Sequence, residues 1–127
     1  MTTLRHHAGP YNVTTAFLDR HVAEGCGGKV AMTCGHRQVT YGDLAALVNR
    51  VGHALKRSGV EHEQRVLLIL PDGPEFAAAY FAAMKIGAVA VPTSTGMRTS
   101  DYAYARGARV RRAPARRYVS PSHARVE

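Results

Sequence analysis

The fold of this chain is decided by residues 65–92, which have the sequence RVLLILPDGPEFAAAYFAAMKIGAVAVP. The stretch begins with a continuous apolar run at residues 65–70, which stops at the chain breakers of residues 71–74. A short apolar run bounded in this way is typical of a strand that is buried on both faces. Such strands occur in parallel sheets, so the stretch predicts an α/β fold class.

A helix and a second strand are expected in the same stretch. Pro74 suits a first helical turn, and the carboxylate of Glu75 suits its positive end. We therefore expect a helix from Glu75 to Ile86 that is closed by Gly87. Residues 88–91 then form a second buried strand. A strand, a helix and a strand with short connections predict one right-handed crossover unit.

The clearest helical pattern precedes this unit. Thr40 and Asp43 approximate a capping box, in which a hydroxyl and a carboxylate meet free backbone N–H groups at a helix start. Gly59 supplies a left-handed cap at the other end. The apolar residues of one face recur at three- and four-residue steps: Leu44, Leu47, Val48, Val51 and Leu55. Polar residues take the opposite face: Asn49, Arg50, His53, Lys56 and Arg57. Together they predict an amphipathic helix.

Two further elements are expected near the N-terminus. A first helix runs to Glu24 from Asn12, whose side chain can cap it. Val13, Ala16 and Phe17 share one face of this helix, and Gly25 ends it. Residues 29–33 and 37–41 alternate apolar and polar positions, which predicts a small hairpin.

The composition fits a folded domain, but the charge is concentrated at one end. The chain has 127 residues, 46% of them hydrophobic, and a formal net charge of +8. Residues 98–127 hold eight arginines and two acidic residues, and residues 105–127 show no helical or alternating period. We therefore divide the chain into a flexible N-terminus, an α/β segment and a disordered Arg-rich tail: residues 1–11, 12–104 and 105–127.

The N-terminus and the cysteines indicate a cytoplasmic protein. The first ten residues lack the apolar run of a secretory signal, and no stretch reaches the roughly 18 apolar residues that span a bilayer. Cys26 and Cys34 are therefore expected as reduced thiols. We expect no membrane as a partner.

Two segments resemble the core motifs of the adenylate-forming (AMP-binding) superfamily. Residues 39–44, VTYGDL, are similar to its first core motif, and residues 84–92, MKIGAVAVP, are similar to its second. The order and spacing of the two also fit. Four shorter segments are similar to benzoate-CoA ligases and related aromatic acid-CoA ligases: residues 16–21, 48–50, 67–72 and 101–104. The resemblance covers residues 12–104.

The resemblance implies an activity and a place in a larger enzyme. Members of the family use ATP and Mg²⁺ to adenylate a carboxylic acid, release pyrophosphate, and transfer the acyl group to coenzyme A (CoA). The phosphate loop, the substrate pocket and the domain with the catalytic lysine have no counterpart in these 127 residues. We therefore expect a partial parallel-sheet N-terminal segment of an adenylate-forming domain. Alone it is inactive, with no catalytic, cofactor-binding or metal-binding residue and no bound cofactor.

The tail departs from the family after Tyr104. The family continues there with a Leu-rich helix, whereas this chain continues with Arg, Ala, Pro and Gly. A GC-rich gene encodes such a composition when it is translated out of frame, so we hypothesise a frameshift or gene break near Tyr104. Two alternatives stay open. The chain is a small basic module that binds nucleic acid, or at least polyanions weakly, through its Arg-rich tail, or it is one part of a split ligase.

Three local patterns could indicate sites, and for each we favour a structural explanation. Residues 25–29 are glycine-rich like a phosphate loop, but they lack its spacing and follow a helix instead of a strand. The seven histidines and two cysteines lack the spacing of zinc sites. Phe76, Tyr80 and Met84 recur every four residues and are expected to pack in the core instead of lining a ligand groove.

Overall fold

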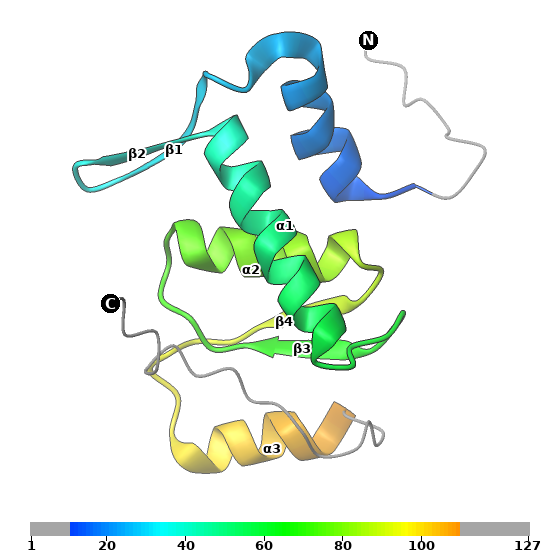
Figure 1. Ribbon diagram of the computed structural model, residues 1–127. Coiled ribbons are helices and arrows are strands. Elements are labelled where there is room, and N and C mark those ends of the chain that lie inside the picture. The colour runs from blue at the N-terminus through cyan, green and yellow to red at the C-terminus, as the bar shows by residue number, and fades with distance from the viewer. Residues whose placement is uncertain (1–10, 110–127) are drawn as a thin grey trace, which may run out of the picture.

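The computed structural model describes residues 11–109 (Figure 1). The N-terminus that we predict to be flexible, apart from Tyr11, and the tail from residue 110 onward lie outside the described residues. The elements in chain order are η1 (Thr15–Asp19), η2 (Val22–Cys26), β1 (Val30–Cys34), β2 (Arg37–Thr40), α1 (Tyr41–Arg57), β3 (Arg65–Leu68), α2 (Pro74–Lys85), β4 (Val89–Pro92) and α3 (Thr99–Arg109). The described residues thus form the predicted α/β arrangement, with an antiparallel hairpin and a parallel pair of strands.

The predicted strand, helix and strand are present. β3 and β4 are adjacent and parallel, with Leu67 opposite Val91, and α2 connects them. Backbone hydrogen bonds extend the pairing to Gln64, just before β3, and to Thr93, just after β4: the carbonyls of Gln64 and Leu68 accept from Val89 and Thr93 at 2.8 and 2.9 Å. The parallel pairing expected from the two apolar runs is therefore confirmed.

The core lies where α1 crosses α2 (Figure 1). α2 contributes Ala78, Ala82 and Ala83, all fully buried, and α1 contributes Val48 and Gly52. Alanine and glycine have the smallest side chains, so the two helices approach each other closely over this contact.

The prediction that Phe76, Tyr80 and Met84 pack in the core is wrong. All three are only half-buried, whereas the alanines at positions 78, 82 and 83 of the same helix are fully buried. Two of the rings pack on each other instead, since the centroids of Phe76 and Tyr80 lie 6.0 Å apart in a stacked arrangement. The contact with α1 has room for alanine methyl groups and excludes wide aromatic rings.

The prediction that both strands of the parallel pair are buried on both faces is also wrong for the described residues. Val66 and Ala90, which are partners in the register, pack against the core. Leu67 and Val91 are half-buried, and Val89 exposes 46% of its surface. The apolar sequence makes each strand suited to burial on both faces, but in the described residues only one face of this sheet is packed against the core.

The N-terminal helix occupies residues 13–26, close to the predicted range, and includes the π-helical segments η1 and η2. The apolar face that the sequence indicates is only partly covered, since Val13 and Ala16 are half-buried. Phe17 exposes 60% of its surface, whereas Thr14 and Leu18 are buried. The helix is turned so that the hydroxyl of Thr14 can donate to a carbonyl of α2, and this polar contact determines which apolar side chains face inward.

The hairpin and the amphipathic helix agree with the sequence pattern. β1 and β2 pair antiparallel through a turn at Gly35 and His36. α1 buries Leu44, Val48 and Leu55, and its predicted polar face is exposed. The capping box is complete: the Thr40 hydroxyl accepts from Asp43 N–H (3.1 Å), and the Asp43 carboxylate accepts from Thr40 N–H (3.3 Å).

The last helix is longer than the pattern predicts. α3 continues through Arg109 and so includes the first five residues of the stretch 105–127, in which the sequence shows no helical period. Its start is defined by the Asp101 carboxylate, which accepts from the backbone N–H of Arg98 (3.0 Å). Alanine and arginine are both good helix formers, so backbone preference sustains α3 where apolar periodicity is lost. No helix within residues 11–109 has the length and apolarity that crossing a bilayer requires.

We expect Thr40→Ala to lower the free energy of unfolding by about 1 kcal/mol, because it removes the side-chain acceptor at the start of α1. Urea unfolding followed by circular dichroism measures the change. Thr95→Ala is the matched control. Thr95 is exposed in a loop, so its substitution should change the free energy of unfolding by no more than about 0.5 kcal/mol. Equal losses for both variants would show that the capping box does not stabilise the fold.

Candidate functional site

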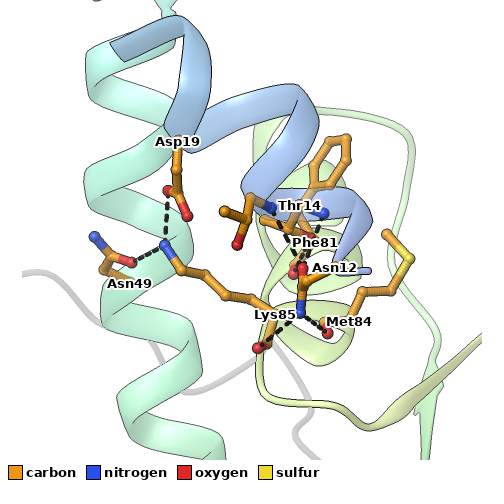
Figure 2. A network of polar contacts seen from close by, with 8 residues as sticks. Asn12, Thr14, Asp19, Asn49, Phe81, Met84 and Lys85 are labelled. Atoms are coloured by element: carbon orange, nitrogen blue, oxygen red, sulfur yellow. Dashed lines mark hydrogen bonds and ion pairs between the residues drawn. The ribbon is translucent and has the colours of Figure 1, made fainter. Parts of the chain in front are cut away.

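The richest cluster of polar side chains lies where the N-terminal helix, α1 and the C-terminal end of α2 meet (Figure 2). We call this cluster the polar junction, and it consists of Asn12, Thr14, Asp19, Asn49 and Lys85. A half-buried lysine beside a carboxylate could in principle serve in catalysis, so the partners of each group decide what the junction can do.

Asn12 links two helices with one side chain. Its Oδ1 accepts from the backbone N–H groups of Thr14 (3.0 Å) and Thr15 (3.3 Å), which caps the N-terminal helix as predicted. Its Nδ2 donates to the carbonyls of Met84 (3.1 Å) and Lys85 (3.2 Å). The last carbonyls of a helix have no partner within it, so Asn12 also satisfies the end of α2.

Thr14 and Lys85 complete the attachment. The Thr14 side chain is fully buried, and its hydroxyl donates to the carbonyl of Phe81 (2.9 Å). The ammonium of Lys85 lies 2.7 Å from Asp19 Oδ1 and 2.8 Å from Asn49 Oδ1. The ammonium, carboxylate and amide groups thus bind one another, and they hold the three helices together. None of these groups is left free to act as a base or a nucleophile.

The second core motif, residues 84–92, begins inside this junction. Lys85 makes the contacts just described, and Gly87 adopts a positive φ of 80° immediately after α2. Its carbonyl accepts from the backbone N–H of Glu63 (2.7 Å), and a Cβ on Gly87 would overlap the imidazole ring of His62. The lysine and the glycine of this motif therefore have structural roles here.

The first core motif, residues 39–44, is the capping box of α1. The hydroxyl and the backbone N–H of Thr40 hydrogen-bond to the Asp43 carboxylate and hold its pKa below the usual range. This carboxylate is therefore a stable anion at the positive end of α1, which is the role of a helix cap and not of a general base near neutral pH.

The glycine-rich loop of residues 25–29 lies between the N-terminal helix and β1, as the sequence predicts. The carbonyl of Gly27 accepts from Gly42 N–H (2.8 Å), and that of Lys29 accepts from Tyr41 N–H (2.9 Å). The loop thus directs carbonyl groups at the start of α1. A phosphate-binding loop needs N–H groups directed at the ligand, so this contact is a structural one.

The histidines and cysteines do not gather into a ligand set. Within residues 11–109, no three His, Cys, Asp or Glu side chains lie close enough to hold a metal ion. Cys26 and Cys34 are free thiols. The ring of His21 stacks on Tyr41, with centroids 4.8 Å apart, and its buried Nδ1 has no hydrogen-bond partner. The ring therefore acts as part of the packing between the N-terminal helix and α1.

Sequence reasoning identified Asn12 as a cap and placed Lys85 in a motif, but it missed that the two belong to one junction. Asp19 and Lys85 are separated by 66 residues, so no local spacing relates them. Thr14 was also missed, because a threonine near the start of a helix gives no signal of burial.

Comparison with known proteins gives a family match. The model of the family described as AMP-binding enzyme matches residues 18–108, which include both core motifs.

Individual relatives are similar over the same region. The 3-hydroxybenzoate–CoA ligase of Aromatoleum sp. is 41% identical over 96 residues, or 76% of this chain and 18% of the relative. The 4-hydroxybenzoate–CoA/benzoate–CoA ligase of Rhodopseudomonas palustris is 42% identical over 94 residues, or 74% of this chain and 17% of the relative.

A solved structure agrees. The benzoate CoA ligase from Burkholderia xenovorans LB400 superposes with a TM-score of 0.69 at 32% identity, covering 76% of this chain and 19% of that one. The chain spans less than a fifth of the length of these relatives.

We expect Lys85→Met to lower the free energy of unfolding by about 2 kcal/mol, because it leaves the half-buried Asp19 carboxylate without its cation. Arg20→Met is the matched control. It breaks an exposed ion pair with Glu24 and should leave the free energy of unfolding nearly unchanged, because solvent screens that pair. Urea unfolding measures both, and equal losses would mean that the junction adds nothing beyond an ordinary surface pair.

We expect Gly87→Ala to destabilise the fold more than Gly59→Ala. Both glycines have φ near +80°, which costs an alanine about 1 kcal/mol, but only the Cβ at position 87 meets another side chain. Displacing His62 adds about 1 kcal/mol. In a His62→Ala background, Gly87→Ala and Gly59→Ala should lower the free energy of unfolding by the same amount, as measured by urea unfolding. A difference that persists there would assign the extra cost to another contact.

Proposed function

Because the chain belongs to the family of AMP-binding enzymes, we propose that it is the N-terminal part of an acid–CoA ligase that acts on an aromatic carboxylate. The complete enzyme adenylates the carboxylate with ATP and then transfers the acyl group to the thiol of CoA. The names of the relatives support an aromatic substrate, since two are hydroxybenzoate–CoA ligases and the superposed structure is a benzoate CoA ligase.

The chain contributes scaffold to that ligase and by itself catalyses no adenylation. The observation that carries this proposal is that the polar residues of both core motifs are committed to internal contacts. Thr40 and Asp43 cap α1, and Lys85 binds Asp19 and Asn49. A group that holds the fold together in this way is not available to bind a substrate or to move a proton.

The residues present do not fit the cofactors of the family. Residues 11–109 contain no cluster of three candidate metal ligands, and the glycine-rich loop directs carbonyls at α1. ATP, Mg²⁺ and CoA are therefore bound by other parts of the complete ligase. ATP and CoA are abundant in the cytoplasm, and the free thiols of Cys26 and Cys34 agree with that location.

A chimera tests this function. The 94-residue matched segment of the Rhodopseudomonas palustris ligase is replaced by the matching segment of this chain, and benzoate-dependent ATP–pyrophosphate exchange is measured. We expect the chimera to retain exchange within roughly tenfold of the parent, since scaffold can be replaced by scaffold of the same packing.

The isolated chain and the unmodified ligase are measured in the same assay. The chain alone should show no exchange above the background without enzyme. Exchange by the chain alone would contradict its scaffold role, and a folded but inactive chimera would contradict its assignment to this group of ligases.

A further inference from the structure

The β1–β2 hairpin extends outward from the start of α1 (Figure 1). Residues 33–38, which we call the hairpin tip, are all exposed. Within residues 11–109, a single hydrogen-bonded ion pair joins the tip to another element: Arg37 Nη1 donates to Glu75 Oε1 at 2.9 Å. Glu75 lies in the first turn of α2, so this pair attaches the tip to the start of that helix.

The base of the hairpin is fixed by several contacts. Val39 exposes only 4% of its surface and belongs to the core, and Met32, its partner in the register, packs against the core. The carbonyl of Lys29 accepts from the backbone N–H of Tyr41 (2.9 Å), which joins the hairpin to the start of α1. The hairpin is therefore anchored as far as Val39, and beyond this point its position depends on the ion pair.

The ion pair is too weak to lock the tip in place. The side chains of Arg37 and Glu75 expose 61% and 62% of their surface. An exposed pair of this kind shifts an equilibrium by at most about fivefold, and added salt screens it further. The attached and released positions of the tip are therefore close in free energy, so that solution conditions change their populations.

Both members of the pair are charged near neutral pH. The hydrogen bond from Arg37 is the main cause that lowers the pKa of the Glu75 carboxyl, and the backbone N–H of Glu75 adds to it. Asp43 is the other carboxylate on which Arg37 acts, but it is bound by the hydroxyl and the backbone N–H of Thr40. Glu75 is thus the carboxylate that holds the tip.

We propose that the Arg37–Glu75 ion pair is a salt-sensitive latch that sets the position of the hairpin tip against the start of α2. In the attached state the tip lies against α2. In the released state it swings away, while Val39 keeps the base of the hairpin in the core. The latch consists of residues of this chain alone, so it is independent of the ligase function.

Double electron–electron resonance on the full chain measures the position of the tip. One spin label is attached at His36→Cys in the hairpin turn and the other at Ala54→Cys on the exposed face of α1, after Cys26→Ser and Cys34→Ser remove the native thiols. Glu75→Gln should lower the ratio of attached to released populations by roughly twofold to fivefold, because the amide has no charge to attract the guanidinium.

Glu24→Gln is the matched control. It also removes one carboxylate from an exposed ion pair with an arginine, but that pair lies within the N-terminal helix and does not involve the tip. It should leave both populations unchanged. Arg37→Gln breaks the latch from the hairpin side without altering the first turn of α2, and circular dichroism verifies that all variants are folded.

The combined variants and the salt series decide the outcome. Arg37→Gln, Glu75→Gln and the double variant should release the tip equally, since each removes the same contact. Raising the ionic strength should release the tip when both residues are present and should have no effect on Glu75→Gln. Additive effects in the double variant, one unchanged distance in every variant, or equal release by Glu24→Gln would overturn the latch.

Discussion

The close contact between α1 and α2 is the constraint on which the rest of the structure depends. Ala78, Ala82 and Ala83 face Val48 and Gly52, and a Cβ at Gly52 would already lie 3.5 Å from the side chain of Ile86. Larger residues in this contact would push the helices apart, because a packed interior has little room to yield. The separation of the helices in turn sets how far the end of α2 lies from the polar face of α1.

The polar junction follows from that separation. Lys85 reaches Asn49 across the two helices, and Asn12 and Thr14 attach the N-terminal helix to carbonyls of α2. Hydrogen bonds are directional, so they fix the rotation of the N-terminal helix more strictly than apolar contact would. This explains why Leu18 is buried while Phe17, one residue away, remains exposed.

The features that sequence reasoning predicted correctly are those fixed by near neighbours. The cap formed by Thr40 and Asp43 and the helix start at Pro74 each depend on a few adjacent residues, and the parallel pairing follows from two apolar runs joined by one helix. The predictions that failed depend on distant partners. The exposed position of Phe17 and the open face at Val89 are set by elements that pack on them or are absent, which periodicity along one segment does not encode.

The same physics explains how a family signature can mark residues that serve the packing of a segment. A cap at Thr40, a lysine that joins three helices and a glycine at a positive φ are demands of packing, and any chain that adopts this arrangement must meet them. Chemistry makes separate demands, on groups that are left unpaired and open to a ligand. Similarity over residues 18–108 therefore establishes the family and the fold, and it assigns no chemical role to the residues that make these structural contacts.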